Sequence, residues 1–172
     1  MKKIILTVMA MLAAVLVADA QIPDFRAKGY KGNVSYTNQY FVWQGIETSH
    51  GYMFDSHNYL GGGAGAFLAP IDDVPPAFAY VFAEYSFYIM NRKNTPFVSV
   101  KIGACQALDE KDADGDFKFS VAAIAEPAVG WSWGLKSGKG LLLGIASPIF
   151  VSNDGFSTSV QVMPKLSFGF EF

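Results

Sequence analysis

The sequence is poor in cysteine and in charge, and each shortage excludes a class of protein. Cys105 is the only cysteine among 172 residues, so a small scaffold held by intramolecular disulfides is excluded. Charged residues make up 16% of the chain, against about 25% in an average soluble protein, and no basic patch with interleaved aromatics points to nucleic acid. After residue 20, no unbroken apolar run reaches the roughly 18 residues that a spanning helix needs. Hydrophobic residues nevertheless form 51% of the chain, which favours many alternating strands.

The N-terminal segment predicts export. A basic pair is followed by an apolar run over residues 4–17 and by Ala18-Asp19-Ala20, which has the small-x-small form of a signal-peptidase site. We expect residues 1–20 to be removed as a signal peptide, with an uncleaved membrane anchor as the alternative. Residues 21–28 then form a polar, periplasmic lead-in to the folded domain.

The C-terminal stretch carries the clearest pattern. Large apolar side chains at Leu166, Phe168, Phe170 and Phe172 alternate with small or charged ones. A period of two indicates a strand with one apolar and one polar face. We expect this strand to complete a closed barrel.

Turn chemistry divides the chain into eight candidate strands. They run over about residues 30–38, 46–54, 59–68, 77–89, 96–104, 117–133, 139–146 and 157–172. Most reach the roughly 9–11 residues of a tilted membrane strand. Short turns alternate with longer connections, which we expect at residues 39–45, 69–76, 105–116 and 147–156. Outer-membrane barrels have short turns on one rim and longer loops on the other.

The predicted fold is therefore an eight-stranded antiparallel up-and-down transmembrane β-barrel over residues 29–172. Lipid offers no water to satisfy open sheet edges, so the strands must close. We expect the protein in the cell outer membrane of a Gram-negative bacterium, with the short turns in the periplasm and the longer loops at the cell surface. The closing strand, through Leu166, Phe168, Phe170 and Phe172, then matches the C-terminal assembly signal read by the barrel-insertion machinery.

The polar faces of the strands predict what fills the barrel. Six charged residues are expected to point inward and to pair: Lys31, Glu84, Lys101, Glu126, Lys165 and Glu171. A narrow ion path along them is the alternative to a structural network. Inward glycines would make room for larger side chains opposite, at positions 61, 63, 65, 130, 144 and 169. Aromatic residues near strand ends suit interfacial girdles: Tyr30, Tyr52, Phe54, Tyr59, Tyr88 and Trp133.

Several short motifs give the sequence a family resemblance. They are Tyr30-Lys31-Gly32, Thr48-Ser49-His50-Gly51-Tyr52, Leu60-Gly61-Gly62-Gly63, Phe82-Ala83-Glu84 and Leu166-Ser167-Phe168-Gly169-Phe170. From about residue 29 to 172 the chain resembles the small outer-membrane β-barrel proteins of Bacteroidetes, of the porin-family or OmpA/OmpX-like type. The resemblance implies an eight-stranded outer-membrane barrel and carries no catalytic residues.

Three motifs could carry chemistry, and each has a simpler interpretation. The glycine-rich stretch at residues 61–65 lacks the following helix that a phosphate loop needs, so close strand packing is favoured. The acidic run at residues 109–116 offers weak metal candidates in Asp112, Asp114 and Asp116, but its spacing departs from a calcium-binding EF-hand, and a solvated loop is favoured. Of the two histidines, only His50 could lie on the long-loop side, where an acyl-transferring barrel enzyme would need it.

The sequence thus predicts a non-enzymatic barrel with a structural or surface-interaction role in the cell envelope. The alternatives are a narrow channel or small-ligand-binding barrel and, third, a lipid-modifying outer-membrane enzyme. A soluble periplasmic barrel is a fourth hypothesis. The expected partners are outer-membrane lipid, lipopolysaccharide and the insertion machinery. We expect a monomer, and neither a cofactor nor a nucleic-acid partner.

Overall fold

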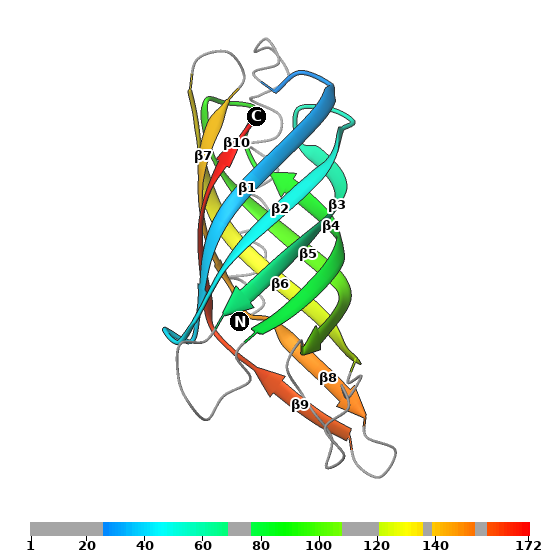
Figure 1. The fold of residues 1–172 in the computed structure, drawn as a ribbon. Helices are drawn as coiled ribbons and strands as arrows, with labels where there is room; N and C mark the ends of the chain where they lie inside the picture. The colour runs from blue at the N-terminus through cyan, green and yellow to red at the C-terminus, as the bar shows by residue number, and fades with distance from the viewer. Residues whose placement is uncertain (1–25, 69–76, 108–120, 136–138, 154–157) are drawn as a thin grey trace, which may run out of the picture.

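A computed structural model describes residues 26–68, 77–107, 121–135, 139–153 and 158–172, and over these residues the chain forms a closed antiparallel sheet (Figure 1). Its strands are β1 Gly29–Gln39, β2 Trp43–Met53, β3 Asn58–Leu68, β4 Ala77–Tyr88, β5 Asn94–Ala107, β6 Val121–Gly134, β7 Gly140–Ala146, β8 Ile149–Asn153, β9 Thr158–Val162 and β10 Lys165–Glu171. Within these ranges, no helix is long and apolar enough to cross a membrane.

The ten strand segments form the eight strands of one barrel. β7 and β8 both pair with β6 in a single register, and β10 and β9 pair with β7 and β8 in the same way. The two interruptions fall at Pro148 and Pro164, because proline has no N–H to donate to the ladder. The ring closes where β10 pairs with β1, with Phe170 opposite Val34. The predicted eight-stranded antiparallel up-and-down fold is therefore confirmed.

Two rims bound the barrel. The short-turn rim contains the β2–β3 turn at residues 54–57, the β4–β5 turn at 89–93, the start of β1 and the end of β10. In the first of these turns, one Asp55 carboxylate oxygen accepts hydrogen bonds from the backbone N–H groups of His57 and Asn58, each 2.8 Å long. The opposite rim contains the β1–β2 turn. Figure 1 shows β8 and β9 projecting beyond this turn.

The predicted connections differ from the structure in three places. β1 and β2 leave only Tyr40–Val42 between them, rather than residues 39–45, and the chain reverses there with positive φ values at Tyr40 (53°) and Phe41 (60°). The expected loop at 147–156 is largely strand, because β8 resumes directly after Pro148. Likewise β5 continues through Ala107, past the expected loop start at Cys105. The opposite rim was expected to have only long connections, but its β1–β2 turn is as short as those of the other rim.

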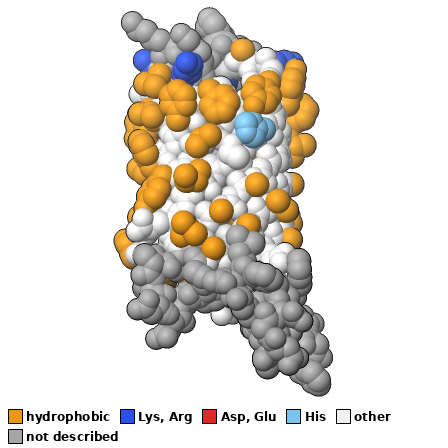
Figure 2. Space-filling model, viewed as in Figure 1, with side chains coloured by type: hydrophobic (Ala, Val, Ile, Leu, Met, Phe, Trp, Pro, Cys, Tyr) orange, Lys and Arg blue, Asp and Glu red, His pale blue; other side chains and the backbone are white. Residues whose placement is uncertain are grey.

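The outer wall is largely apolar. In β10, Leu166 and Phe168 are 43% and 54% exposed, while Lys165 and Glu171 are 1% and 2% exposed. The predicted shared face of the apolar residues in this strand is thus confirmed. Figure 2 shows hydrophobic side chains spread over the wall, with Lys and Arg side chains visible only at one end.

Glycines and aromatic rings fill the inside together. A Cβ atom added to Gly63 would collide with the carbonyl oxygen of Thr48 and the ring of Phe82. Added to Gly130, it would lie 2.5 Å from the ring of Phe97. Tyr59 and Tyr88 are only 2% and 4% exposed, so their assignment to the outer girdles was wrong. The other four predicted girdle residues do lie on the outer surface: Tyr30, Tyr52, Phe54 and Trp133.

Candidate functional site

Four charged side chains from four different strands meet inside the barrel. Lys165 Nζ lies 2.7 Å from Glu47 Oε2 and 2.9 Å from Glu126 Oε2. Lys101 Nζ lies 3.3 Å from Glu126 Oε1 and also donates to Glu47. The Tyr80 hydroxyl donates to Glu47 as well. We call these five residues the inner cluster. Its two cations and two carboxylates balance, which a dry interior requires because an unpaired charge there costs several kcal/mol.

A second polar group lies at the short-turn rim. Lys31 Nζ is 2.8 Å from Glu171 Oε1, and the same oxygen accepts a 2.7 Å hydrogen bond from the Tyr88 hydroxyl. Ser132 Oγ donates to Glu171 Oε2 at 2.9 Å, and Arg26 Nη2 donates to Ser132 Oγ at 2.8 Å. The Arg26 guanidinium also stacks 4.4 Å from the centre of the Tyr88 ring. These five residues form the mouth cluster.

A small cavity separates the two clusters. Its volume is about 40 Å³, and its lining includes Tyr88 from the mouth cluster, Lys101 from the inner cluster, and Glu84. Glu84 is 7% exposed, and its Oε1 accepts a 2.8 Å hydrogen bond from Ser86 Oγ. Its Oε2 is buried without a hydrogen-bond partner among the described residues. The cavity is polar and large enough for water, which could satisfy this oxygen.

The interior charges sum to zero over the described residues. The buried or nearly buried cations are Arg26, Lys31, Lys101 and Lys165, and the carboxylates are Glu47, Glu84, Glu126 and Glu171. The two clusters are unequal, since the mouth cluster carries two cations and one carboxylate. The Glu84 carboxylate supplies the balancing negative charge, so the two clusters and Glu84 form one compensated system.

The structure places the six predicted interior charges in three settings, with Lys31 in the mouth cluster. Lys101, Glu126 and Lys165 meet in the inner cluster, Glu171 belongs to the mouth cluster, and Glu84 faces the cavity between them. Sequence reasoning missed two charged members of the network, Glu47 and Arg26. Glu47 sits on the polar face of β2 with Gly45 and Ser49, so the alternation used for other strands would have found it. Arg26 precedes β1, where no strand pattern applies.

Aromatic side chains fill the barrel between the inner cluster and the opposite rim. Phe67 stacks on Phe78 and on Tyr80, with ring centres 4.9 and 5.3 Å apart. Cys105 and Ile124 are buried in the same group. The thiol of Cys105 is therefore a small core side chain, and the lumen at this level is closed by rings.

His50 lies on the outer surface, close to the short-turn rim, so its expected place on the long-loop side is wrong. The Tyr30 hydroxyl is 2.5 Å from Nδ1 of His50, and Thr48 Oγ1 is 2.9 Å from Nε2. Thr48 Oγ1 donates its own hydrogen to the carbonyl oxygen of Asn33 at 3.0 Å. Thr48 Oγ1 must therefore accept a hydrogen bond from the Nε2–H group of His50, and Nδ1 of His50 then accepts one from the Tyr30 hydroxyl. Both ring nitrogens are satisfied in this neutral tautomer.

The metal candidates Asp112, Asp114 and Asp116 lie outside the described residues. Within the part of the chain that the structure describes, no group of three histidine, cysteine or acidic side chains could hold a metal ion.

Two solved structures share this architecture. Neisserial surface protein A (NspA) matches with a TM-score of 0.62 at 11% identity, covering 85% of this chain and 98% of that one. The N-terminal β-barrel domain of Pseudomonas aeruginosa OprF matches with a TM-score of 0.59 at 13% identity, covering 85% and 100%. No family model matches the sequence, and no curated protein matches it significantly. At these identities the likeness shows a shared barrel fold.

Proposed function

We propose that this chain is an outer-membrane barrel with a non-enzymatic, structural or surface-interaction role in the cell envelope. One observation carries the proposal: the polarity of the barrel is inverted relative to a soluble protein. Ile46, Ile102 and Phe168 are 65%, 64% and 54% exposed, whereas Glu126 and Lys165 are each 1% exposed. An apolar outer band around a polar interior is typical of barrels whose solvent is lipid.

The filled interior supports a structural role over a transport role. Two charge clusters, which carry no net charge together with Glu84, and a block of aromatic rings occupy successive levels of the lumen. An eight-stranded barrel is just wide enough for its own side chains. In this proposal the short-turn rim faces the periplasm, and the partners of the wall are outer-membrane lipid and lipopolysaccharide. The insertion machinery recognises the closing strand by its outward Phe168, Phe170 and Phe172. The chain acts as a monomer.

Fractionation tests the location. We expect the full chain to remain with outer membranes after a carbonate wash and to migrate faster on a gel when unheated than when boiled. Release into the carbonate wash, together with a single gel mobility, would contradict the proposal and favour a soluble barrel. A periplasmic marker protein serves as the washing control.

A narrow cation path is the second candidate, and Glu84 is the observation that favours it. Its unpartnered oxygen faces a water-sized cavity between the two clusters. In planar bilayers, a path through this cavity predicts a small cation-selective conductance that Glu84→Gln reduces. Glu171→Gln is not a suitable control because it breaks the mouth cluster, so the exposed Lys93→Gln is used instead. No discrete conductance from the unmodified protein would remove this candidate.

A further inference from the structure

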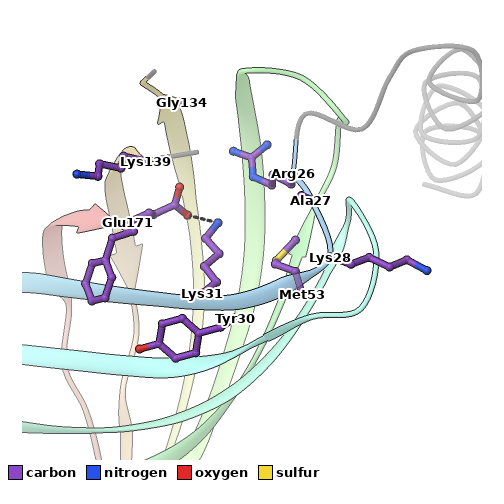
Figure 3. Close-up of a pocket in the computed structure, with 10 residues that line it drawn as sticks. Arg26, Ala27, Lys28, Tyr30, Lys31, Met53, Gly134, Lys139 and Glu171 are labelled. Carbon is purple, nitrogen blue, oxygen red and sulfur yellow. Dashed lines mark ion pairs between the residues drawn. The ribbon is translucent and has the colours of Figure 1, made fainter. Parts of the chain in front are cut away.

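A cavity of about 430 Å³ opens at the short-turn rim, above the mouth cluster (Figure 3). Its volume is within the range of pockets that hold small ligands, about 300–1,000 Å³. The lining residues come from the lead-in before β1, from β1 and β2, and from the ends of β6, β7 and β10. This cavity is separate from the 40 Å³ cavity that Glu84 faces.

The lining of this mouth cavity is strongly biased toward positive charge. Four cationic side chains line it, Arg26, Lys28, Lys31 and Lys139, against one carboxylate, Glu171. The side-chain charge of the lining is therefore four minus one, an excess of three positive charges. Elsewhere inside the barrel the carboxylates Glu47, Glu84 and Glu126 outnumber the cations Lys101 and Lys165, so the positive excess is confined to this end.

The single carboxylate is already engaged and cannot neutralise the rest. Glu171 Oε1 accepts from Lys31 and from Tyr88, and its Oε2 accepts from Ser132. Glu171 is 2% exposed and forms the floor of the cavity with Lys31. Figure 3 shows Lys28 and Lys139 extending to opposite sides of this ion pair. Their flexible four-carbon chains can carry an ammonium group toward a ligand from either side.

We propose that the mouth cavity binds a small polyanion of the phosphate class, such as a diphosphate group. Lysine ammonium groups bind phosphate oxygens as point charges and impose little geometry, which suits a site with lysines on two sides. The apolar side chains of Tyr30, Met53 and Phe172 complete the wall and can cover the uncharged part of a larger phosphate ester. The site does not depend on the proposed membrane location.

Calorimetric titration of the detergent-solubilised full chain with inorganic pyrophosphate tests the site. Exposed charge pairs contribute modestly, so we expect Lys28→Gln and Lys139→Gln each to weaken binding about threefold, and the double variant about tenfold. The matched control is Lys93→Gln, which removes an exposed lysine from the same rim but outside the cavity lining. We expect the control to bind within about twofold of the unmodified protein.

Three results would overturn the proposal: no pyrophosphate binding by the unmodified chain, equal weakening in all three single variants, or unchanged binding in the double variant. Equal weakening would mean that diffuse rim charge attracts the anion. Nanodiscs then distinguish two sources of phosphate. If phosphatidylglycerol nanodiscs suppress pyrophosphate binding and phosphatidylcholine nanodiscs do not, the cavity takes a lipid headgroup. If the two lipids give equal binding, it takes a free phosphate compound. Either of these two outcomes supports the proposed phosphate-binding site.

Discussion

Replacing Lys165 with methionine removes the cation at the centre of the inner cluster. Lys165 Nζ contacts both Glu47 and Glu126, at 2.7 and 2.9 Å, and its side chain is 1% exposed. Removing one partner of a buried ion pair costs about 3–5 kcal/mol, because the remaining charge is left uncompensated. Lys101 still contacts both carboxylates, so we expect the lower end of this range, about 3 kcal/mol.

The loss is measured by reversible urea unfolding from phospholipid vesicles. The three tryptophans, Trp43, Trp131 and Trp133, report the transition by fluorescence. With a urea dependence of about 2 kcal/mol per M, a 3 kcal/mol loss lowers the midpoint by about 1.5 M. The exposed Lys93→Met is the matched control, and we expect it to change stability by less than about 0.5 kcal/mol.

A second substitution separates charge imbalance from lost packing. Lys165→Met combined with Glu126→Gln leaves Glu47 and Lys101 as one balanced pair. We therefore expect the double variant to recover about 2 kcal/mol relative to Lys165→Met alone. If the double variant is less stable than the single variant, or if Lys165→Met shifts the midpoint no more than the surface control does, the inner cluster does not stabilise the barrel as argued.

Three further predictions follow from the wall, the closing strand and the β2–β3 turn. Gly63→Ala should abolish the faster gel band of the unheated, folded protein, because the added Cβ would collide with backbone. Gly62→Ala is the control and should retain this band, because its Cβ meets only one carbonyl oxygen, at 3.3 Å. Equal behaviour of the two variants would contradict the packing argument. Phe172→Asp should leave the chain in the periplasm, and normal outer-membrane levels would refute the assembly role of that residue. Burial alone would raise the pKa of Asp55, but hydrogen bonds to its carboxylate outweigh burial and lower it. The stability that Asp55 contributes is therefore present above its unfolded pKa and is lost as the pH falls through its folded pKa. Carboxyl carbon NMR should show the midpoint rising in Asn58→Ala, and an unchanged midpoint would refute this cause.

Period-two alternation predicted which side chains share a face of a strand, and turn chemistry gave the number of strands in the barrel. In β10 the pattern separates outward Phe168 from inward Glu171, and the structure has this arrangement. The same rule, applied to β2, would also have placed Glu47 inside, so the sequence contains enough information to predict this residue. Which of the inward charges meet could not be predicted, because pairing across the lumen depends on the shear of the closed ring.

The errors fall where a local signal has two physical meanings. The seventh strand was expected to end at residue 146 and to lead into a long connection, yet the ladder resumes at Ile149, directly after Pro148, with its register unchanged. Tyr59 and Tyr88 lie close to strand ends and so resembled girdle residues, but alternation points both of them inward. The tight turn at Tyr40 and Phe41 has aromatic residues at positive φ, where glycine or asparagine would be the usual sequence signal.

The distribution of the inner cluster along the chain has a consequence for assembly. Glu47 belongs to the second strand, Glu126 to the sixth and Lys165 to the last. Until the last strand arrives, Lys101 is the only cation of the inner cluster, which then holds one surplus negative charge, while Arg26 and Lys31 at the mouth lack the Glu171 carboxylate. Docking of β10 brings the missing cation at the same moment as its backbone seals the ring. Closure is thus the electrostatically neutralising step, and the network favours a completed barrel over any open intermediate.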